Sequence, residues 1–222
     1  MRRRALGVCS ALTLLLVGCV TPTKRAAAPL PPSAPTSVEG LAAAIQDDAA
    51  RIEKEQNDDV RARLADEAMA YADACMAEAP QAAACLYGRG LAYGLQARTH
   101  RAQALGLLKP MLESLNAADA ADPGYDNAGP ARVRSQLLLK APSWPAGPGD
   151  PDAALDSAKR AVELRPQYPP NLLALAQALA ATGDANAAKE TYLRARDAAQ
   201  ALPAGDSRDG WIREADQGLQ RK

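Results

Sequence analysis

The side chains that could carry chemistry in this 222-residue chain are few and scattered. His100 is the only histidine, and it follows Arg98 and Thr99 at a predicted helix junction, where a histidine is most simply solvated or caps a helix end. The acidic pairs Asp47-Asp48 and Asp58-Asp59 are adjacent in sequence, so their side chains point in different directions on a helix and favour a solvated face over an acid/base pair. No phosphate loop, serine elbow or zinc-protease motif is present. We therefore expect no enzyme, no cofactor and no metal site.

The N-terminal segment has the form of an export signal. Arg2, Arg3 and Arg4 precede an uncharged apolar run from Ala5 to Gly18, which is short for a bilayer span but typical of a signal peptide. The run Leu16-Val17-Gly18-Cys19 resembles the lipobox of bacterial lipoproteins, which implies cleavage after residue 18 and lipidation of Cys19. Val20, rather than aspartate, follows this cysteine, and by analogy with lipoprotein sorting this favours the outer membrane. An ordinary secretory signal or a membrane anchor is the alternative.

Cys75 and Cys85 are the cysteines that remain if Cys19 is acylated and the signal is removed. They lie on either side of a predicted turn at Pro80, so antiparallel helices could bring them within bonding distance in an oxidising periplasm. The alternative is that each is a small buried residue at a helix contact. We favour the disulfide.

The composition predicts an all-α fold behind a flexible tether. Alanine and leucine predominate, phenylalanine is absent, and aromatic residues make up 4% of the chain. Residues 19–36 are rich in proline and alanine and are expected to form an extended tether, whereas residues 37–222 form the helical domain. Thr36-Ser37-Val38-Glu39 has the form of a capping box that opens the first helix. The balanced charge, which becomes negative once the three arginines are removed, excludes a nucleic-acid-binding surface.

A 34-residue period organises the helical domain. Ala154 aligns with Ala188, and Ala161 with Ala195, at the period typical of tetratricopeptide repeats. In the last repeat, Gly183 and Asp184 occupy the turn between the helices. The residues at the repeat's packing positions are Leu172, Leu175, Ala176 and Leu179 in the first helix, and Ala188, Tyr192 and Ala195 in the second. The sequence therefore predicts an α-solenoid of about four helical hairpins with a C-terminal capping helix at 208–220.

An earlier repeat is less regular. Gly90 belongs to its first helix and Ala102 to its second, where Pro110 should bend the chain. The excess length before the next repeat falls in two loops, 121–130 and 141–151, on either side of a short helix at 131–140. We expect small side chains at the close contacts between helices, at Ala68, Ala102, Ala154, Ala161, Ala176, Ala188 and Ala195.

The irregular part resembles the TatT family, periplasmic tetratricopeptide lipoproteins associated with tripartite ATP-independent periplasmic (TRAP) transporters. The resemblance rests on Gly129-Pro130, on Ala141-Pro142-Ser143-Trp144-Pro145, and on Gly149-Asp150 leading into the helix that ends at Pro166. It covers roughly residues 40–200. It implies a lipid-anchored periplasmic protein whose partner is a TRAP-type substrate-binding protein, with a small apolar or organic-acid ligand in the same pathway.

The concave face of such a repeat protein is the expected binding surface. The first-helix positions beside the packing residues are Tyr87, Leu91, Arg132, Gln136, Leu173 and Gln177, and any of them could instead be core. Trp144, between prolines in an inserted loop, either anchors a partner or seals its loop onto the repeats. The first hypothesis is thus a protein-binding module. The alternative is a scaffold or pilotin-like lipoprotein of a secretion or pilus machine.

Overall fold

The computed structural model of the protein describes residues 29–221. The predicted signal peptide, Cys19 and most of the tether lie outside the described residues. Within residues 29–221, no helix is both long enough and apolar enough to cross a membrane. The described part of the chain is all-α, as the composition predicts.

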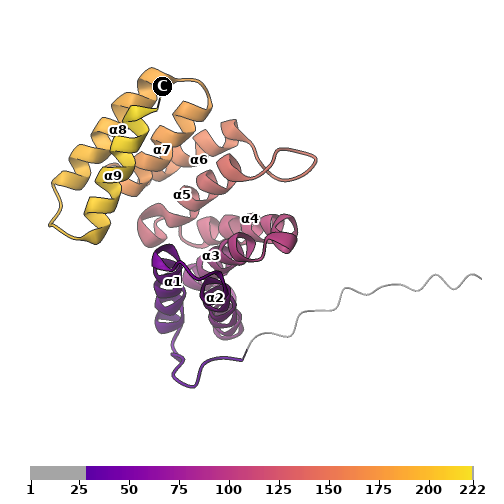
Figure 1. Ribbon diagram of the computed structural model, residues 1–222. Helices are drawn as coiled ribbons and strands as arrows, with labels where there is room; N and C mark the ends of the chain where they lie inside the picture. Colours follow the sequence, from indigo (N-terminus) through magenta and orange to yellow (C-terminus); the bar gives the residue numbers. More distant parts are fainter. Residues whose placement is uncertain (1–28, 222) are drawn as a thin grey trace, which may run out of the picture.

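Nine α-helices and one short 3-10 helix make up the described residues, and consecutive helices pair as antiparallel hairpins (Figure 1). The hairpins are α1 (Val38–Lys54) with α2 (Asp58–Glu78), α3 (Ala83–Thr99) with α4 (Ala104–Ala121), α5 (Tyr125–Lys140) with α6 (Pro151–Leu164), and α7 (Pro169–Ala181) with α8 (Ala185–Gln200). Helix α9 (Asp206–Gln220) packs on α7 and α8, and η1 (Arg101–Gln103) precedes α4. This confirms four hairpins and a terminal capping helix.

The hairpins stack into a curved solenoid. Each first helix contacts the first helix of the next repeat, in the series α1, α3, α5, α7 and α9, whereas the backbones of successive second helices lie farther apart. The first helices therefore form the inner, concave layer. The two ends of the stack approach each other, because Lys54 Nζ at the end of α1 lies 3.3 Å from Asp206 Oδ2 at the start of α9.

Polar caps begin four of the helices. The Oδ1 atoms of Asn57, Asp150 and Asp184 each accept backbone N–H bonds in the first turns of α2, α6 and α8. At α1 the cap is Ser37, whose Oγ accepts from Gly40 N at 3.1 Å. The prediction of a capping box from Thr36 to Glu39 is therefore wrong, because Ser37 is the N-cap and Gly40, which has no side chain to complete the box, stands three residues after it.

Alanine at the helix contacts lets neighbouring helices approach closely. Six of the seven predicted positions are buried: Ala68, Ala154, Ala161, Ala176, Ala188 and Ala195. Ala102 does not follow this prediction, because η1 interrupts the chain there and leaves its side chain exposed. Helix α4 begins after this 3-10 turn and runs through Pro110 as one helix.

The region between the second and third hairpins departs from the predicted boundaries. The predicted loop at 121–130 is shorter, since α4 extends to Ala121 and α5 begins at Tyr125. The start of α5 contains a left-handed turn, with φ of 47°, 54° and 64° at Asp126, Asn127 and Ala128. The second loop, 141–150, is closed by a single bridge between Ser143 and Gly149.

Cys75, in the last turn of α2, is bonded to Cys85, in the first turn of α3. Both residues are fully buried in a core formed mainly by α1, α2 and α3. The disulfide closes a short loop around the turn at Pro80 and so joins consecutive repeats covalently where α2 packs on α3.

Candidate binding groove

A groove of about 800 Å³ lies on the concave side of the solenoid. It is lined by the inner helices α1, α3, α5 and α9, by the first half of α4, and by the start of the loop after α5. We call this surface the concave groove. Its lining residues are Ala49, Ala50, Glu53, Leu91, Gly94, Leu95, Ala97, Arg98, Ala104, Leu105, Leu108, Met111, Arg132, Val133, Gln136, Leu137, Lys140, Ala141, Pro142 and Trp211.

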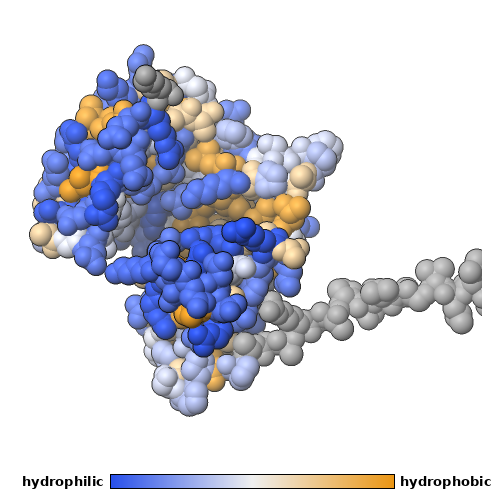
Figure 2. All heavy atoms as spheres, viewed as in Figure 1, coloured by the Kyte–Doolittle hydropathy of each residue, from blue (hydrophilic) through white to orange (hydrophobic). Residues whose placement is uncertain are grey.

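One wall of the concave groove is apolar and open to solvent. Leu91 on α3 and Leu108 and Met111 on α4 pack together, and Leu105 in the first turn of α4 is 59% exposed. Figure 2 shows hydrophobic side chains gathered over α4 and α5, between the two ends of the solenoid. An exposed leucine next to other apolar side chains marks a surface that can be covered by a partner.

Helix α5 contributes a polar stripe to the concave groove. Arg132, Gln136 and Lys140 follow one another at intervals of four residues, so they share one helix face, and all three line the concave groove. Another ion pair lines the groove, with Arg98 Nη1 at 2.6 Å from Glu53 Oε1. The concave groove therefore combines apolar side chains with a polar stripe.

Arg132 is fixed by a buried hydrogen-bond network. Its Nη2 donates to Asp126 Oδ2 at 2.9 Å, and its Nη1 donates to the carbonyls of Asp126 and Asn127, so it holds the left-handed turn in place. The Tyr87 hydroxyl donates to the same carboxylate at 2.8 Å, and burial raises the pKa of this phenol well above its usual range. Asn171 Oδ1 accepts from Arg132, which ties α5 to α7. Arg132 is thus mainly a structural centre with one edge on the concave groove.

The structure brings together three of the predicted groove residues, Leu91, Arg132 and Gln136. The prediction for Tyr87 and Leu173 is wrong, since both are 3% exposed. The turn at the start of α5 covers Tyr87, and Leu173 lies in a core that includes residues of α9. These two positions would face a groove only if the next inner helix left them uncovered.

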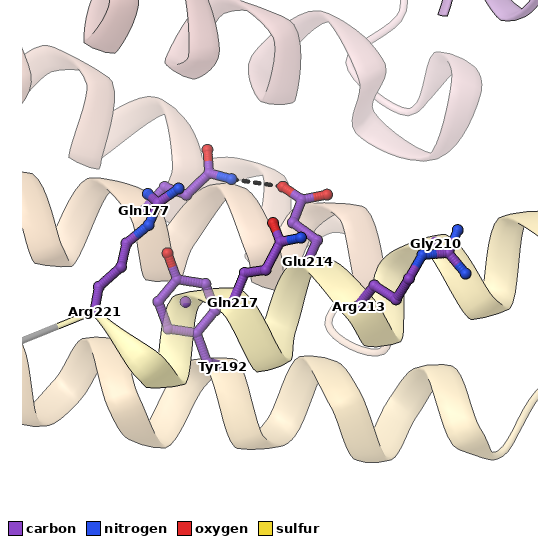
Figure 3. Close-up of a pocket in the computed structure, with 8 residues that line it drawn as sticks. Gln177, Tyr192, Gly210, Arg213, Glu214, Gln217 and Arg221 are labelled. Carbon is purple, nitrogen blue, oxygen red and sulfur yellow. Dashed lines mark hydrogen bonds between the residues drawn. The ribbon is translucent and has the colours of Figure 1, made fainter. Parts of the chain in front are cut away.

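Gln177 lies in a separate, polar pocket of about 330 Å³ among α7, α8 and α9. Figure 3 shows its amide nitrogen bonded to Glu214 on α9, a contact of 2.6 Å, with Tyr192 and Arg221 nearby. The pocket is floored by the Tyr192 ring, against which Gly218 packs so closely that a Cβ atom would collide with it. We interpret the polar contacts of Gln177 as the attachment of the capping helix.

Trp144 is 87% exposed, so the interpretation that it seals its loop onto the repeats is wrong. It does not line the concave groove, but Ala141 and Pro142 of the same loop do. Backbone bonds hold the loop, with Gly149 N donating to Pro142 O at 2.9 Å and Asp150 N to Leu138 O at 3.0 Å. The loop therefore presents an uncovered tryptophan beyond one end of the groove.

Most of the groove lining is not predicted from the sequence, and the residues that matter most for its chemistry are Leu105, Leu108, Lys140 and Trp211. The apolar run from Ala104 to Leu108 could have indicated that Leu105 and Leu108 are exposed, because the second helix of a regular repeat carries more polar residues at these positions. The sequence predicts Trp211 as part of the capping helix but not as a groove residue. Its ring lines the groove and also packs edge-on against the Tyr168 ring, with 5.8 Å between the ring centroids.

The remaining ionisable candidates are structural. His100 ends α3 and its Nε2 lies 3.2 Å from Asp66 Oδ1. Asp47, Asp58 and Asp59 are exposed as predicted, but Asp48 is 2% exposed, because it faces the interior beside α2. Among residues 29–221, no group of three or more histidine, cysteine, aspartate or glutamate side chains could hold a metal ion.

Comparison with known proteins agrees with this architecture. The tetratricopeptide repeat family matches residues 146–205, which comprise α6, α7 and α8. A crystal structure of a thermophilic tetratricopeptide protein from Thermus thermophilus is similar over 82% of this chain and 92% of its own, with 19% identity and a TM-score of 0.56. The MamA protein gives 16% identity and a TM-score of 0.44, over 82% of this chain and 90% of its own. No curated protein sequence matches the chain. The family match to residues 146–205 and the Thermus thermophilus structure support a tetratricopeptide-type helical solenoid.

Proposed function

Starting from this tetratricopeptide-type solenoid, we propose that the chain is a non-catalytic protein-binding module of the periplasm, anchored through lipid at Cys19. Its partner in this proposal is the substrate-binding protein of a TRAP-type transporter. The observation that carries the binding role is the concave groove, whose apolar wall at Leu91, Leu105 and Leu108 is open to solvent on the inner face of the repeats. Exposed apolar surface of this kind is costly unless a partner covers it.

Two further features support the periplasmic part of the proposal. Residues 1–19 contain the arginines, the apolar run and the cysteine of a lipoprotein signal. The disulfide between Cys75 and Cys85 suits an oxidising compartment, since the cytoplasm keeps such thiols reduced. The TRAP partner rests on the resemblance of residues 129–166 to the TatT family.

The second candidate is a pilotin-like or assembly scaffold. It is favoured by Trp144, which is 87% exposed on a closed loop outside the concave groove. A scaffold holds two components, and a rigid loop with an exposed tryptophan would be a second contact surface.

Affinity capture from detergent-solubilised membranes of the native bacterium tests the proposal. Leu105→Arg should abolish recovery of the partner, because it places a charge on the apolar wall at a position exposed enough to leave folding intact. Leu202→Arg is the matched control, since Leu202 is also a partly exposed leucine, at 39%, but lies in the loop before α9, away from the groove. Tyr87 and Leu173 are unsuitable for this experiment because both are buried.

Mass spectrometry of the captured proteins distinguishes the two candidates. We expect a TRAP-type substrate-binding protein with the wild-type chain and with Leu202→Arg, and its loss with Leu105→Arg. Recovery of secretin or pilus components that depends on Trp144 would instead favour the scaffold. Equal recovery by all variants would contradict a role for the groove.

A further inference from the structure

Among the described residues, the concave groove has one charge that the protein itself does not neutralise. Arg132 pairs with Asp126 and Arg98 pairs with Glu53, at 2.9 Å and 2.6 Å between their polar atoms. Lys140 lines the groove and makes no ion pair within residues 29–221. Its place in the last turn of α5 is favourable for a cation, but this interaction with the helix end leaves the charge uncompensated.

Lys140 continues a stripe that offers polar contacts along the groove. Gln136 lies one helical turn before it on the same face, and its amide makes no side-chain hydrogen bond in the part of the chain that the structure describes. Four residues correspond to a rise of about 6 Å along α5. Beside this stripe, Val133 and Leu137 of α5 pack with the apolar residues of α3 and α4, and Leu105 is the exposed end of this apolar surface. The groove thus combines an apolar surface with a polar stripe that carries the cation of Lys140.

We infer that the concave groove binds an amphipathic helix of the partner protein, with the apolar face of that helix on α4 and its acidic edge beside Lys140 and Gln136. This inference rests on the proposed function and specifies the partner's chemistry. A helix with acidic residues at four-residue intervals would follow the spacing of the stripe on α5. The remaining face of this helix, which contacts neither the apolar surface nor the polar stripe, would be polar and would point to solvent through the open side of the groove.

The open side of the groove favours a helix over an acyl chain. A hydrocarbon chain gains most from an enclosed cavity, whereas Leu105 at 59% exposure shows that this wall remains in contact with water. The volume of about 800 Å³ accommodates several apolar side chains from one face of a helix. Figure 2 shows the same hydrophobic surface accessible from outside.

Two stapled peptides of about 14 residues, four helical turns, probe the inference by fluorescence anisotropy. Both carry the same leucine face and the same staple on the outward face, and they differ only in glutamate or lysine along the edge of the leucine face. The protein is the full chain with Cys19→Ser, which removes the predicted lipid site. A solvated ion pair is worth up to about 1 kcal/mol, so we expect the acidic peptide to bind about two- to fivefold more tightly than the basic one.

Variants at Lys140 test the origin of this preference. Lys140→Gln should remove the preference, and Lys140→Glu should reverse it, so that the acidic peptide loses roughly five- to twentyfold in affinity. Lys189→Glu makes the same charge change at an exposed site on α8 that does not line the groove, and it should leave the preference unchanged. Leu105→Arg should weaken both peptides.

The results separate this inference from the proposed function. If both peptides bind equally and Leu105→Arg weakens both, the acidic edge is wrong while the groove remains a protein-binding site. If neither peptide binds, or if dodecanoate binds and excludes both, the helical occupant is wrong, and the capture experiment alone decides the proposed function. A preference that also reverses with Lys189→Glu would reflect net charge and would overturn the assignment to Lys140.

Discussion

Asp48 offers the sharpest test of the packing of the first hairpin. Its side chain is buried on α1; Oδ1 accepts from Arg51 Nη1 at 2.8 Å, whereas Oδ2 has no hydrogen-bond partner in the described residues. Burial raises the pKa of this carboxyl from 3.8 to about 6, with smaller contributions from Glu67 and Asp47, while Arg51 opposes the shift. The folded protein therefore holds a proton on Asp48 more tightly than the unfolded chain does.

The direction of the pH dependence follows from this raised pKa. The contribution of Asp48 to stability is fully present below the unfolded pKa of 3.8 and is lost as the pH rises through about 6. A shift of about two pKa units corresponds to a loss of about 3 kcal/mol once the carboxyl is ionised in both states. Asp48→Asn stays neutral, so its unfolding free energy relative to wild type should increase by about 1.4 kcal/mol between about pH 5 and about pH 8.

Urea unfolding followed by far-ultraviolet circular dichroism at three pH values between these limits measures the effect. The asparagine amide of the variant has an unpartnered polar atom, which changes its unfolding free energy by an amount that does not depend on pH. The test is therefore the slope of the difference in unfolding free energy, variant minus wild type, against pH. Asp47→Asn is the control, because Asp47 is the exposed neighbour on the same helix and its replacement leaves the buried Asp48 carboxyl in place, so its pH-dependent difference should be much smaller. A difference for Asp48→Asn that is flat, or that falls with rising pH, would refute the assignment of a desolvated carboxylate at this position.

Three other perturbations test separate parts of the protein. Arg132→Met should lower the free energy of unfolding by about 3 kcal/mol, because it removes the ion-pair partner of the partly buried Asp126 carboxylate and a side-chain donor to two carbonyls of the left-handed turn. Equilibrium urea unfolding measures this loss, and a value below about 1 kcal/mol would contradict the central role of the network. Replacement of both Cys75 and Cys85 by serine should lower the free energy of unfolding by about 3 kcal/mol, because the short loop is no longer closed. The fall in the urea midpoint relative to oxidised wild type measures this loss, and an unchanged midpoint under matched conditions would show that the disulfide does not stabilise the fold. Cys19→Ser should abolish incorporation of radiolabelled palmitate and release the chain from the membrane fraction, and persistent labelling would rule out this lipidation site.

The repeat period predicted the helices well where the repeat is regular. Gly183 adopts φ of 89° in the turn between α7 and α8, and Asp184 caps α8, as the sequence indicates. Both features are local, because a glycine in a left-handed turn and a capping aspartate act within a few residues. The same reasoning failed at Ala102, because nothing local to that alanine requires the 3-10 turn that moves it to the surface.

The binding surface was harder to predict because it depends on which inner positions remain uncovered. Leu91 on α3 and Leu173 on α7 both belong to inner helices, yet Leu91 lines the groove and Leu173 is covered when α9 packs on α7. Lys140 gains its importance only because the neighbouring cations already have partners. Such properties arise from packing between repeats, and a periodic pattern in one chain does not contain them.

The contact between Lys54 and Asp206 has a mechanical consequence. The two residues are more than 150 positions apart in sequence. Their ion pair directly links α1 and α9, the helices at the two ends of the curved solenoid. Both side chains are more than 70% exposed, so the link is worth at most about 1 kcal/mol, comparable to thermal energy, and weakens as salt is added. The ends can therefore separate by small rotations shared among the repeat interfaces, and the mouth of the groove can widen to admit a bulky segment while every hairpin stays folded.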